Sequence, residues 1–251
     1  MTIKRILILI LVCVSIGTQA QMSAARKLLL TGNSAGTYPY HVGDLTLAEA
    51  DCTTGTSLTF DYPPNIEAGD LILYVAYSKS GTTVPYPSGF SSIAISNATN
   101  MNTRVAYKLA TGSESGEITV AGFTAGVNAG FLSLYRNVDN SDIMEGTYSA
   151  NANTSSSTIT GTVKESTLNL VRALCISFMT GSGHDVRYLS NGGIIMDEDS
   201  YFTCSSDTGV TFSIQSLDLD VNASDITVTK TILESVNFRT INLVLKGNDS
   251  Y

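Results

Sequence analysis

The sequence is short of charged residues and contains no tryptophan. Only 14% of its 251 residues are Asp, Glu, Lys or Arg, and the formal net charge is −8. It contains no cluster of basic residues. Because phosphate groups are bound by clustered Lys and Arg, we do not expect a nucleic acid as partner. The two histidines, His41 and His184, have no Cys or second His beside them, so they form no recognisable zinc motif.

The chain also has almost no helical periodicity, apart from a weak helical turn around Leu45 to Ala50. Short apolar or alternating runs recur instead, separated by Gly, Asn and Ser/Thr clusters, which is typical of strands and turns. The predicted fold is therefore all-β: a single antiparallel β-sandwich, jelly-roll-like. The predicted strands are 58–60, 70–77, 104–109, 117–120, 129–135, 156–163, 169–178, 201–204, 210–214, 226–231 and 238–245.

The two halves of the chain resemble each other. Leu71 to Gly81 and Val171 to Gly181 are both apolar strands that run into a loop rich in Gly, Ser and Thr. An internal duplication explains this likeness, and so do two sheets built from the same kinds of strand. No linker separates the halves, since the polar stretch Asn151 to Thr158 has only the length of a loop. We therefore expect one β-sandwich domain over residues 58–251, preceded by an N-terminal extension over residues 21–57.

The first twenty residues have the organisation of a signal peptide. Basic residues at positions 4 and 5 are followed by an apolar run from Ile6 to Ile16, and small residues then allow cleavage after Ala20. Residues 1–20 are therefore predicted to be a signal peptide, and the protein to be secreted or surface-displayed. Since the apolar run is too short to span a bilayer well, no integral membrane segment is expected after cleavage. A true start at Met22 would instead favour a virion location.

Cysteines are few as well. After cleavage of the signal peptide, Cys52, Cys175 and Cys204 remain. Three thiols allow at most one intrachain disulfide, and both a Cys52–Cys204 bridge and free buried thiols stay open as alternatives. Cys175 lies in an apolar run and is predicted to be a small buried hydrophobic residue.

Four short motifs occur in order between Ala68 and Asp139. They are Ala68-Gly69-Asp70 before an apolar run, Pro87-Ser88-Gly89-Phe90, the segment Ala106 to Glu114 (AYKLATGSE), and Leu134 to Asp139 (LYRNVD). The series resembles the β-sandwich domain of secreted bacterial surface proteins and of phage tail and virion proteins, in which the pattern is roughly GDLLV, PSGW, YKxATGxE and YRGVD. The resemblance implies a module for display or adhesion rather than an enzyme.

The chain departs from this pattern at two positions. Phe90 stands where the family has Trp, which removes a potential stacking platform for sugars. Asn137 stands where the family has Gly. After Gly, Asn is the residue that best tolerates a left-handed backbone, so a turn is predicted at Asn137. The glycines, prolines and tyrosines of the motifs are explained as turns and as packed strand residues.

One segment resembles a catalytic motif. Gly32-Asn33-Ser34-Ala35-Gly36 matches the GxSxG pattern of a serine nucleophile. A nucleophile elbow needs a helix directly after the serine, on an α/β sheet. Here Thr37-Tyr38-Pro39-Tyr40 follows, and no helical pattern is present. We therefore predict no catalytic residue and expect that the protein is not an enzyme.

Aromatic residues are the first candidates for ligand binding. A carbohydrate-binding module needs exposed aromatic rings, and several tyrosines are predicted to lie on loops. These candidates are Tyr38, Tyr40, Tyr86 and Tyr188.

Oxygen ligands are the second candidates. Asp218, Asp220 and Asn222 occupy alternate positions, and alternate side chains of a strand share one face. Since clusters of hard oxygen ligands suit calcium, these residues are a candidate calcium site. An alternating polar outer face of a strand is the other explanation, and no further cofactor is predicted.

These observations favour a non-catalytic structural or adhesive module. It would be displayed on a bacterial cell surface, or on a phage virion as a structural protein of the tail or capsid that serves host attachment. The alternative is a secreted carbohydrate-binding module with a glycan as partner. The predicted strand from Phe238 to Leu245 is long and apolar, so it is either a central strand or an edge that a partner must cover. We therefore expect a homo-oligomer or a larger assembly.

Overall fold

A computed structural model of the chain describes the backbone of residues 39–43, 46–49, 55–79, 83–96, 102–144, 149–163, 171–180, 188–190, 210–219 and 226–248. All of these residues belong to one compact unit, Tyr38–Tyr251. The predicted signal peptide (residues 1–20) and the GxSxG segment around Ser34 lie outside the described residues.

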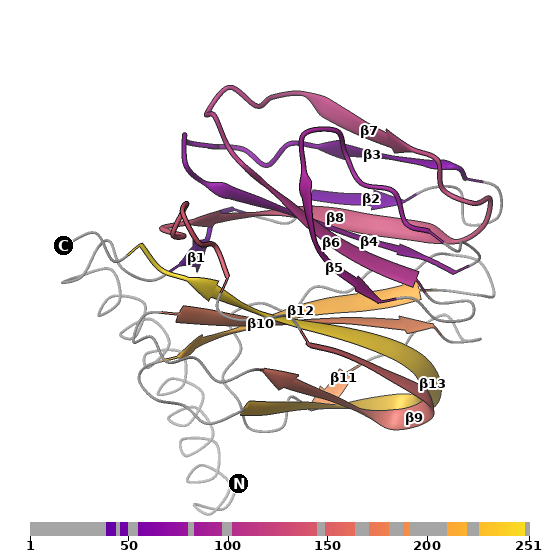
Figure 1. Cartoon of the computed structure of the whole chain (residues 1–251). Helices are drawn as coiled ribbons and strands as arrows, with labels where there is room; N and C mark the ends of the chain where they lie inside the picture. The colour runs from indigo at the N-terminus through magenta and orange to yellow at the C-terminus, as the bar shows by residue number, and fades with distance from the viewer. Residues whose placement is uncertain are drawn as a thin grey trace, which may run out of the picture. The chain divides into compact units, whose positions relative to one another are not determined.

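Every regular element in the described residues is a β-strand, and the paired strands run antiparallel (Figure 1). The all-β prediction is confirmed, whereas jelly-roll closure and internal duplication stay predictions. The strands are β1 (Tyr40–His41), β2 (Thr46–Glu49), β3 (Ser57–Asp61), β4 (Leu71–Ser78), β5 (Ser91–Ser96), β6 (Asn102–Leu109), β7 (Glu117–Ala121), β8 (Asn128–Arg136), β9 (Ser149–Val163), β10 (Val171–Thr180), β11 (Tyr188–Ser190), β12 (Val210–Leu219) and β13 (Ile226–Lys246).

The first sheet has six strands in the order β1-β8-β4-β6-β5, with β2 also paired to β8. Tyr40 of β1 lies opposite Arg136, and Thr46 of β2 lies opposite Leu132. Residues 46–49 therefore form a strand, and the predicted helical turn around Leu45 to Ala50 is wrong, because pairing with β8 overrides a weak local helical pattern. The sheet begins at Tyr40, within the segment that was predicted as an N-terminal extension.

The second sheet has five strands in the order β11-β13-β10-β12, with β9 also paired to β13. β13 is 21 residues long and combines the two strands that were predicted at 226–231 and 238–245. Phe238 pairs with Met179 of β10 on one side and with Asn153 of β9 on the other. The strand from Phe238 to Leu245 is thus interior, and the alternative that it is an edge strand is wrong. An exposed edge at this strand therefore no longer supports the predicted homo-oligomer or larger assembly, which stays a prediction.

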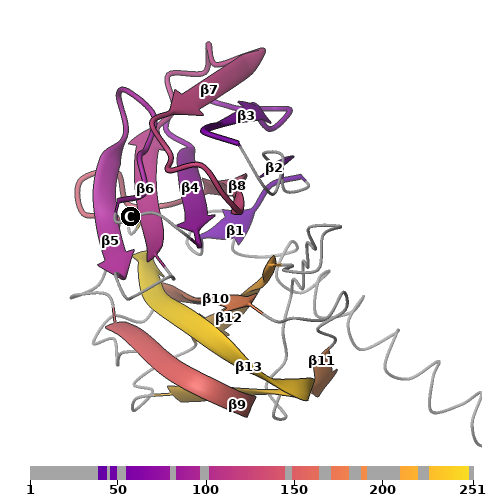
Figure 2. The same ribbon diagram turned by 90° about the vertical axis from the view of Figure 1, so that its right-hand side faces the viewer.

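Strand β4 is buried along its whole length, because both faces of the first sheet are covered. Such continuous burial explains why its sequence is uniformly apolar, a pattern more common in parallel sheets than in antiparallel ones. The even-numbered side chains Ile72, Tyr74 and Ala76 pack with Leu58 and Phe60 of the two-stranded ribbon β3–β7. Figures 1 and 2 show this ribbon on one side of β4.

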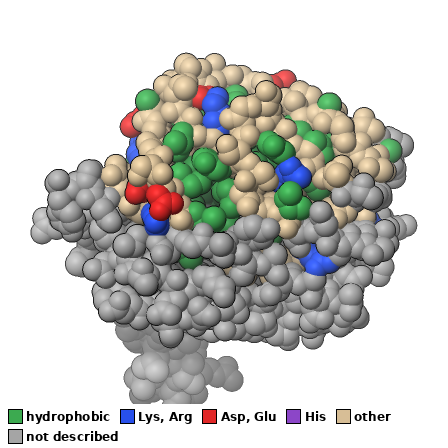
Figure 3. Space-filling model, in the orientation of Figure 1, with side chains coloured by type: hydrophobic (Ala, Val, Ile, Leu, Met, Phe, Trp, Pro, Cys, Tyr) green, Lys and Arg blue, Asp and Glu red, His purple; other side chains and the backbone are tan. Residues whose placement is uncertain are grey.

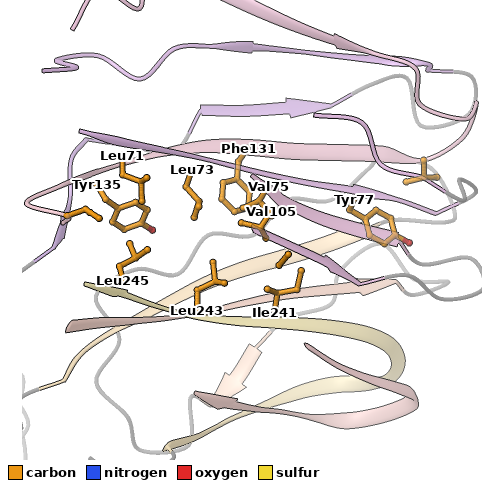
Figure 4. Close-up of a cluster of buried hydrophobic side chains, with 13 residues drawn as sticks. Leu71, Leu73, Val75, Tyr77, Val105, Phe131, Tyr135, Ile241, Leu243 and Leu245 are labelled. Atoms are coloured by element: carbon orange, nitrogen blue, oxygen red, sulfur yellow. The ribbon is translucent and has the colours of Figure 1, made fainter. Parts of the chain in front are cut away.

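The odd-numbered side chains of β4 point to the other face. Leu71, Leu73 and Val75 pack in one cluster with Ile241, Leu243 and Leu245 of β13. Figure 4 shows these two sets of side chains facing each other from the two sheets. The period-two alternation of a strand thus divides one apolar run between two separate cores.

Candidate functional site

The residues of three sequence motifs meet at the end of the first sheet where β4 begins and β6 ends. The Gly69 amide donates to the Ala110 carbonyl at 2.9 Å, and the Ala110 amide donates to the Asp70 carbonyl at 2.8 Å. Gly112 lies so close to Ala68 that a Cβ atom on it would come within 2.9 Å of the Ala68 nitrogen. The motif segments therefore hold each other by backbone contacts.

The buried Asp70 and the partly exposed Arg136 form an ion pair at this sheet end. Asp70 is 2% exposed and accepts hydrogen bonds of 2.8 Å from both Nε and Nη2 of Arg136. The Glu67 amide donates a further bond of 2.9 Å to Asp70. Hydrogen bonding to Asp70 raises the pKa of Arg136. This bidentate geometry is among the strongest that charged groups form, and it fixes the start of β4 to the end of β8.

Glu114 organises the turn that follows β6. Its side chain, 3% exposed, is paired with Lys108 at 2.9 Å and accepts hydrogen bonds from the Thr111 and Gly112 amides. Burial alone would raise the pKa of Glu114, but the hydrogen bonds from Lys108 and Thr111 outweigh it and lower the pKa to about 2. The last residue of the AYKLATGSE motif is thus the anchor of a tight turn.

The LYRNVD motif ends in a turn that contacts the C-terminal part of β13. Asn137 has a φ of 63°, as its place in the family pattern predicts, and its carbonyl accepts a bond of 2.9 Å from the Asn248 amide. Asp139 accepts bonds from the amide and hydroxyl of Ser141, which lower its pKa. Lys246 pairs with Asp142. The charged groups of these motifs are engaged within the fold, so their arrangement is structural.

Phe90, in the remaining motif, is a core residue. It is 7% exposed and packs edge-on against Tyr74, with ring centroids 6.3 Å apart. An aromatic ring at this position fills the core of the first sheet, and it provides no platform for a sugar.

An exposed patch does exist beside Phe90, and Tyr86, Ile95 and Arg104 form it. We call these three residues the Tyr86 patch. Tyr86 is 39% exposed and Ile95 is 37% exposed. The guanidinium carbon of Arg104 lies 4.8 Å from the centroid of the Tyr86 ring. Ile95 of β5 is the cross-strand partner of Arg104 in β6, so both side chains lie on one face. Figure 3 shows hydrophobic and basic side chains exposed over these strands.

The loop that carries Tyr86 is held on both sides. Val84 is 2% exposed, Pro87 is buried, and the Pro85 carbonyl accepts a 2.9 Å hydrogen bond from the Tyr74 hydroxyl. Burial raises the pKa of Tyr74, so this hydroxyl stays protonated and keeps donating. Tyr86 is therefore an exposed ring on a fixed backbone.

The guanidinium of Arg104 is the unusual group of the patch. Its Nε atom is buried and has no hydrogen-bond partner, and no ion pair joins Arg104 to a carboxylate among the described residues. A buried donor without a partner costs free energy, about 1–3 kcal/mol. Stacking on Tyr86 compensates part of this cost through the cation–π attraction.

No family model, curated protein or solved structure matches the chain. The resemblance to surface and virion β-sandwich domains accordingly stays a prediction. The described part of the chain holds no helix of the length and apolarity that a membrane span requires.

The four predicted tyrosines do not form one site in the described structure. Tyr40 is 41% exposed, but it belongs to β1, at the opposite end of the strand order from β5. Its hydroxyl contributes to the raised pKa of Arg136, behind the larger effect of Asp70. Tyr188 lies in β11, on a strand rather than on the predicted loop, and Tyr38 lies outside the described residues. Of the two predicted tyrosines whose side chains the structure describes, Tyr40 and Tyr86, Tyr86 is the one that lies against a guanidinium without a described carboxylate partner.

The predicted calcium ligands are described only in part. Asp218 lies in β12, opposite Arg172 of β10, while Asp220 and Asn222 lie outside the described residues. Within the described ranges, no three His, Cys, Asp or Glu side chains gather as a metal site.

Sequence reasoning identified Tyr86 but missed Arg104 and Ile95. The sequence around each of these two residues gives no sign of a binding site. Their proximity to Tyr86 results from the pairing of β5 with β6 and from the path of the preceding loop. Strand β6 contains two basic residues, Arg104 and Lys108, and the sequence does not show that Arg104 would lie on the ring of Tyr86.

Proposed function

We propose that this protein is a non-catalytic surface module that attaches to its target through the Tyr86 patch, displayed on a bacterial cell or a phage virion. The observation that carries the proposal is the exposed Tyr86 ring with the Arg104 guanidinium above it at 4.8 Å. Tyr and Arg are the residue types that dominate binding energy at protein surfaces.

The surroundings of the patch support attachment. The loop of Tyr86 is anchored by Val84, Pro87 and the Tyr74 hydroxyl, so binding would order few additional groups. Strand β6, which carries Arg104, lies between β4 and β5. A rigid sheet that positions exposed binding residues on a loop is a common arrangement for a binding site.

A binding assay with the full chain tests the proposal. The wild-type protein and the Tyr86→Ala variant are labelled and incubated with a panel of intact bacterial strains, and bound protein is measured by flow cytometry. We expect the variant to bind at least about tenfold more weakly, as for a hot-spot residue.

Tyr40→Ala is the matched control. It removes a ring of nearly equal exposure, 41% against 39%, at the other edge of the sheet. The thermal unfolding of both variants is measured to show that they fold. Attachment that is unchanged by Tyr86→Ala, or reduced equally by both variants, would overturn the proposal.

The carbohydrate-binding alternative also gains a specific observation. The Tyr86 ring is exposed beside the apolar Ile95 side chain, and such a surface accommodates the apolar face of a sugar. A glycan is therefore a suitable target for the same patch.

A further inference from the structure

The Arg104 guanidinium is a cation whose partner within the fold is an aromatic ring and not a carboxylate. Elsewhere in the described structure, Lys108, Arg136 and Lys246 each pair with an acidic side chain. Arg104 has the Tyr86 ring instead, and its Nε atom is buried without a hydrogen-bond partner. In a chain with a formal net charge of −8, acidic side chains are plentiful, yet none of the described ones pairs with it.

The geometry of the group defines which ligand would satisfy it. A guanidinium presents a planar fork of donors that matches a carboxylate, and a carboxylate would supply the missing charge. The neighbouring exposed side chains, Tyr86 and Ile95, are hydrophobic. Ser92 adds an exposed hydroxyl on the same face, because it pairs with Ala106, two positions along β6 from Arg104.

A polyanion does not fit this site. Nucleic acids and polyphosphates are held by several cations, whereas Arg104 is a single one and the net charge of the chain is strongly negative. A neutral sugar would use the ring and leave the guanidinium without a counter-charge. A ligand with one carboxylate, an apolar face and hydroxyl groups could contact all three residues: the carboxylate would pair with Arg104, the apolar face would pack on Tyr86, and a hydroxyl would bond Ser92.

We propose that the Tyr86 patch binds a sugar that carries a carboxylate, with the carboxylate on Arg104 and the apolar face of the sugar ring against Tyr86. This inference rests on the proposed attachment function and specifies its ligand. The carboxylate accepts two hydrogen bonds from the two terminal nitrogens of the guanidinium, because the Nε atom is buried and out of reach of a ligand. The Ser92 hydroxyl lies on the same face of the sheet and can bond a hydroxyl of the sugar.

The test uses the full chain and two probes of equal length, an oligosaccharide of glucuronic acid and one of glucose. Dissociation constants are measured by NMR titration for the wild type and for Arg104→Gln, Arg104→Lys and Tyr86→Ala. We expect the wild type to bind the acidic probe about tenfold to a hundredfold more tightly than the neutral one, as for a charge-assisted contact.

Each variant has its own expected result. Arg104→Gln should bind both probes with equal, weak affinity, because the charge is lost. Arg104→Lys keeps the charge but not the fork, so it should retain a reduced preference for the acidic probe. Tyr86→Ala should weaken the binding of both probes. Tyr40→Ala should match the wild type, and thermal unfolding checks that every variant is folded.

The outcomes separate this inference from the proposed function. If Tyr86→Ala abolishes attachment to cells but neither oligosaccharide binds or competes, the attachment function stands and the acidic sugar is wrong. If a glutamate-rich peptide competed with attachment to cells and the oligosaccharides did not, the ligand would be an acidic protein segment and the proposed acidic sugar would be wrong. If the wild type bound the two probes with equal affinity, Arg104 would not select for a carboxylate and the proposal would be wrong.

Discussion

The two buried carboxylates of the sequence motifs, Asp70 and Glu114, each accept several hydrogen bonds. Asp70 has three donor groups, two from Arg136 and the Glu67 amide. Glu114 has Lys108 and the turn that it closes. At the scale of single residues, these hydrogen bonds and ion pairs explain why the sequence motifs contain acidic and basic residues. Arg104 is different, since its charge faces a ring at the surface.

The turn at Glu114 should make stability depend on pH in the acid range. The pKa of Glu114 is about 2 in the folded protein and 4.5 as the ordinary value. A lowered folded-state pKa gives stability that is complete above pH 4.5 and is lost as the pH falls to 2. We expect Glu114→Gln to lower the free energy of unfolding at pH 7 by about 2 kcal/mol, and to flatten its decline between pH 4.5 and 2.

Urea unfolding at a series of pH values measures this effect, and Glu117→Gln is the control because Glu117 is an exposed glutamate in β7. If Glu114→Gln kept the full acid dependence of the wild type, the role assigned to Glu114 would be wrong.

At the scale of elements, turns and strands are shaped by what approaches them. Gly112 and Gly116 both have positive φ angles, 82° and 73°, in the connection between β6 and β7. A Cβ atom on Gly116 would meet nothing within 4 Å, whereas one on Gly112 would meet the Ala68 backbone at 2.9 Å. The two glycines therefore differ in packing and share their backbone conformation.

Substituting both glycines separates these two effects. We expect Gly116→Ala to destabilise the protein by about 1 kcal/mol, the cost of a left-handed backbone. Gly112→Ala should cost at least about 2 kcal/mol, because the Ala68 segment must also move. Chemical denaturation of the two variants gives the comparison, and equal losses would show that no close approach exists.

Strand β4 leads to a prediction about neighbouring positions. Because both its faces are buried, Ile72→Ala and Leu73→Ala should each lower the free energy of unfolding by about 3 kcal/mol. In a strand with one solvent-facing side, one of two adjacent substitutions would hardly change the free energy of unfolding. Glu117→Gln in β7, at an exposed position, is the control and should change stability by less than about 0.5 kcal/mol. An unchanged free energy of unfolding for Ile72→Ala or Leu73→Ala would contradict the arrangement in which each face of β4 packs in its own core.

At the scale of the whole compact unit, the two large sheets share a core. Leu243 belongs to β13, yet it packs with Leu71, Leu73 and Phe131 of the first sheet. Unfolding of one sheet would therefore expose apolar surface of the other, which favours a single cooperative transition.

Tyrosine fluorescence can report on this coupling, since the chain has no tryptophan. Tyr74, Tyr77 and Tyr135 are buried in the first sheet. We expect Leu243→Ala, in the second sheet, to shift the transition seen by tyrosine emission and that seen by circular dichroism to the same lower urea concentration. Two separate transitions, with tyrosine emission unaffected, would show that the sheets unfold independently.

The sequence by itself determined several strands of this protein closely, although it did not predict β5 and indicated a helical turn in place of β2. The predicted strand at 201–204 lies outside the described residues. Apolar runs and turn residues are local signals, so β4 was predicted at 70–77 and lies at Leu71–Ser78, and β8 was predicted at 129–135 and lies at Asn128–Arg136. The all-β class follows from the same local signals. The left-handed turn at Asn137 was instead predicted from the resemblance, in which Gly stands at this position, because Asn is the residue that best tolerates this backbone after Gly.

Only the tertiary structure decided which residues are neighbours. It joined two predicted strands into β13 and gave that strand a partner on each side, because pairing is chosen among segments far apart in the chain. It placed Phe90 in the core and left Tyr86 exposed, four residues away. It also brought Arg104 to the Tyr86 ring. Such contacts depend on register and on which face is already covered, and no local pattern in the sequence encodes either.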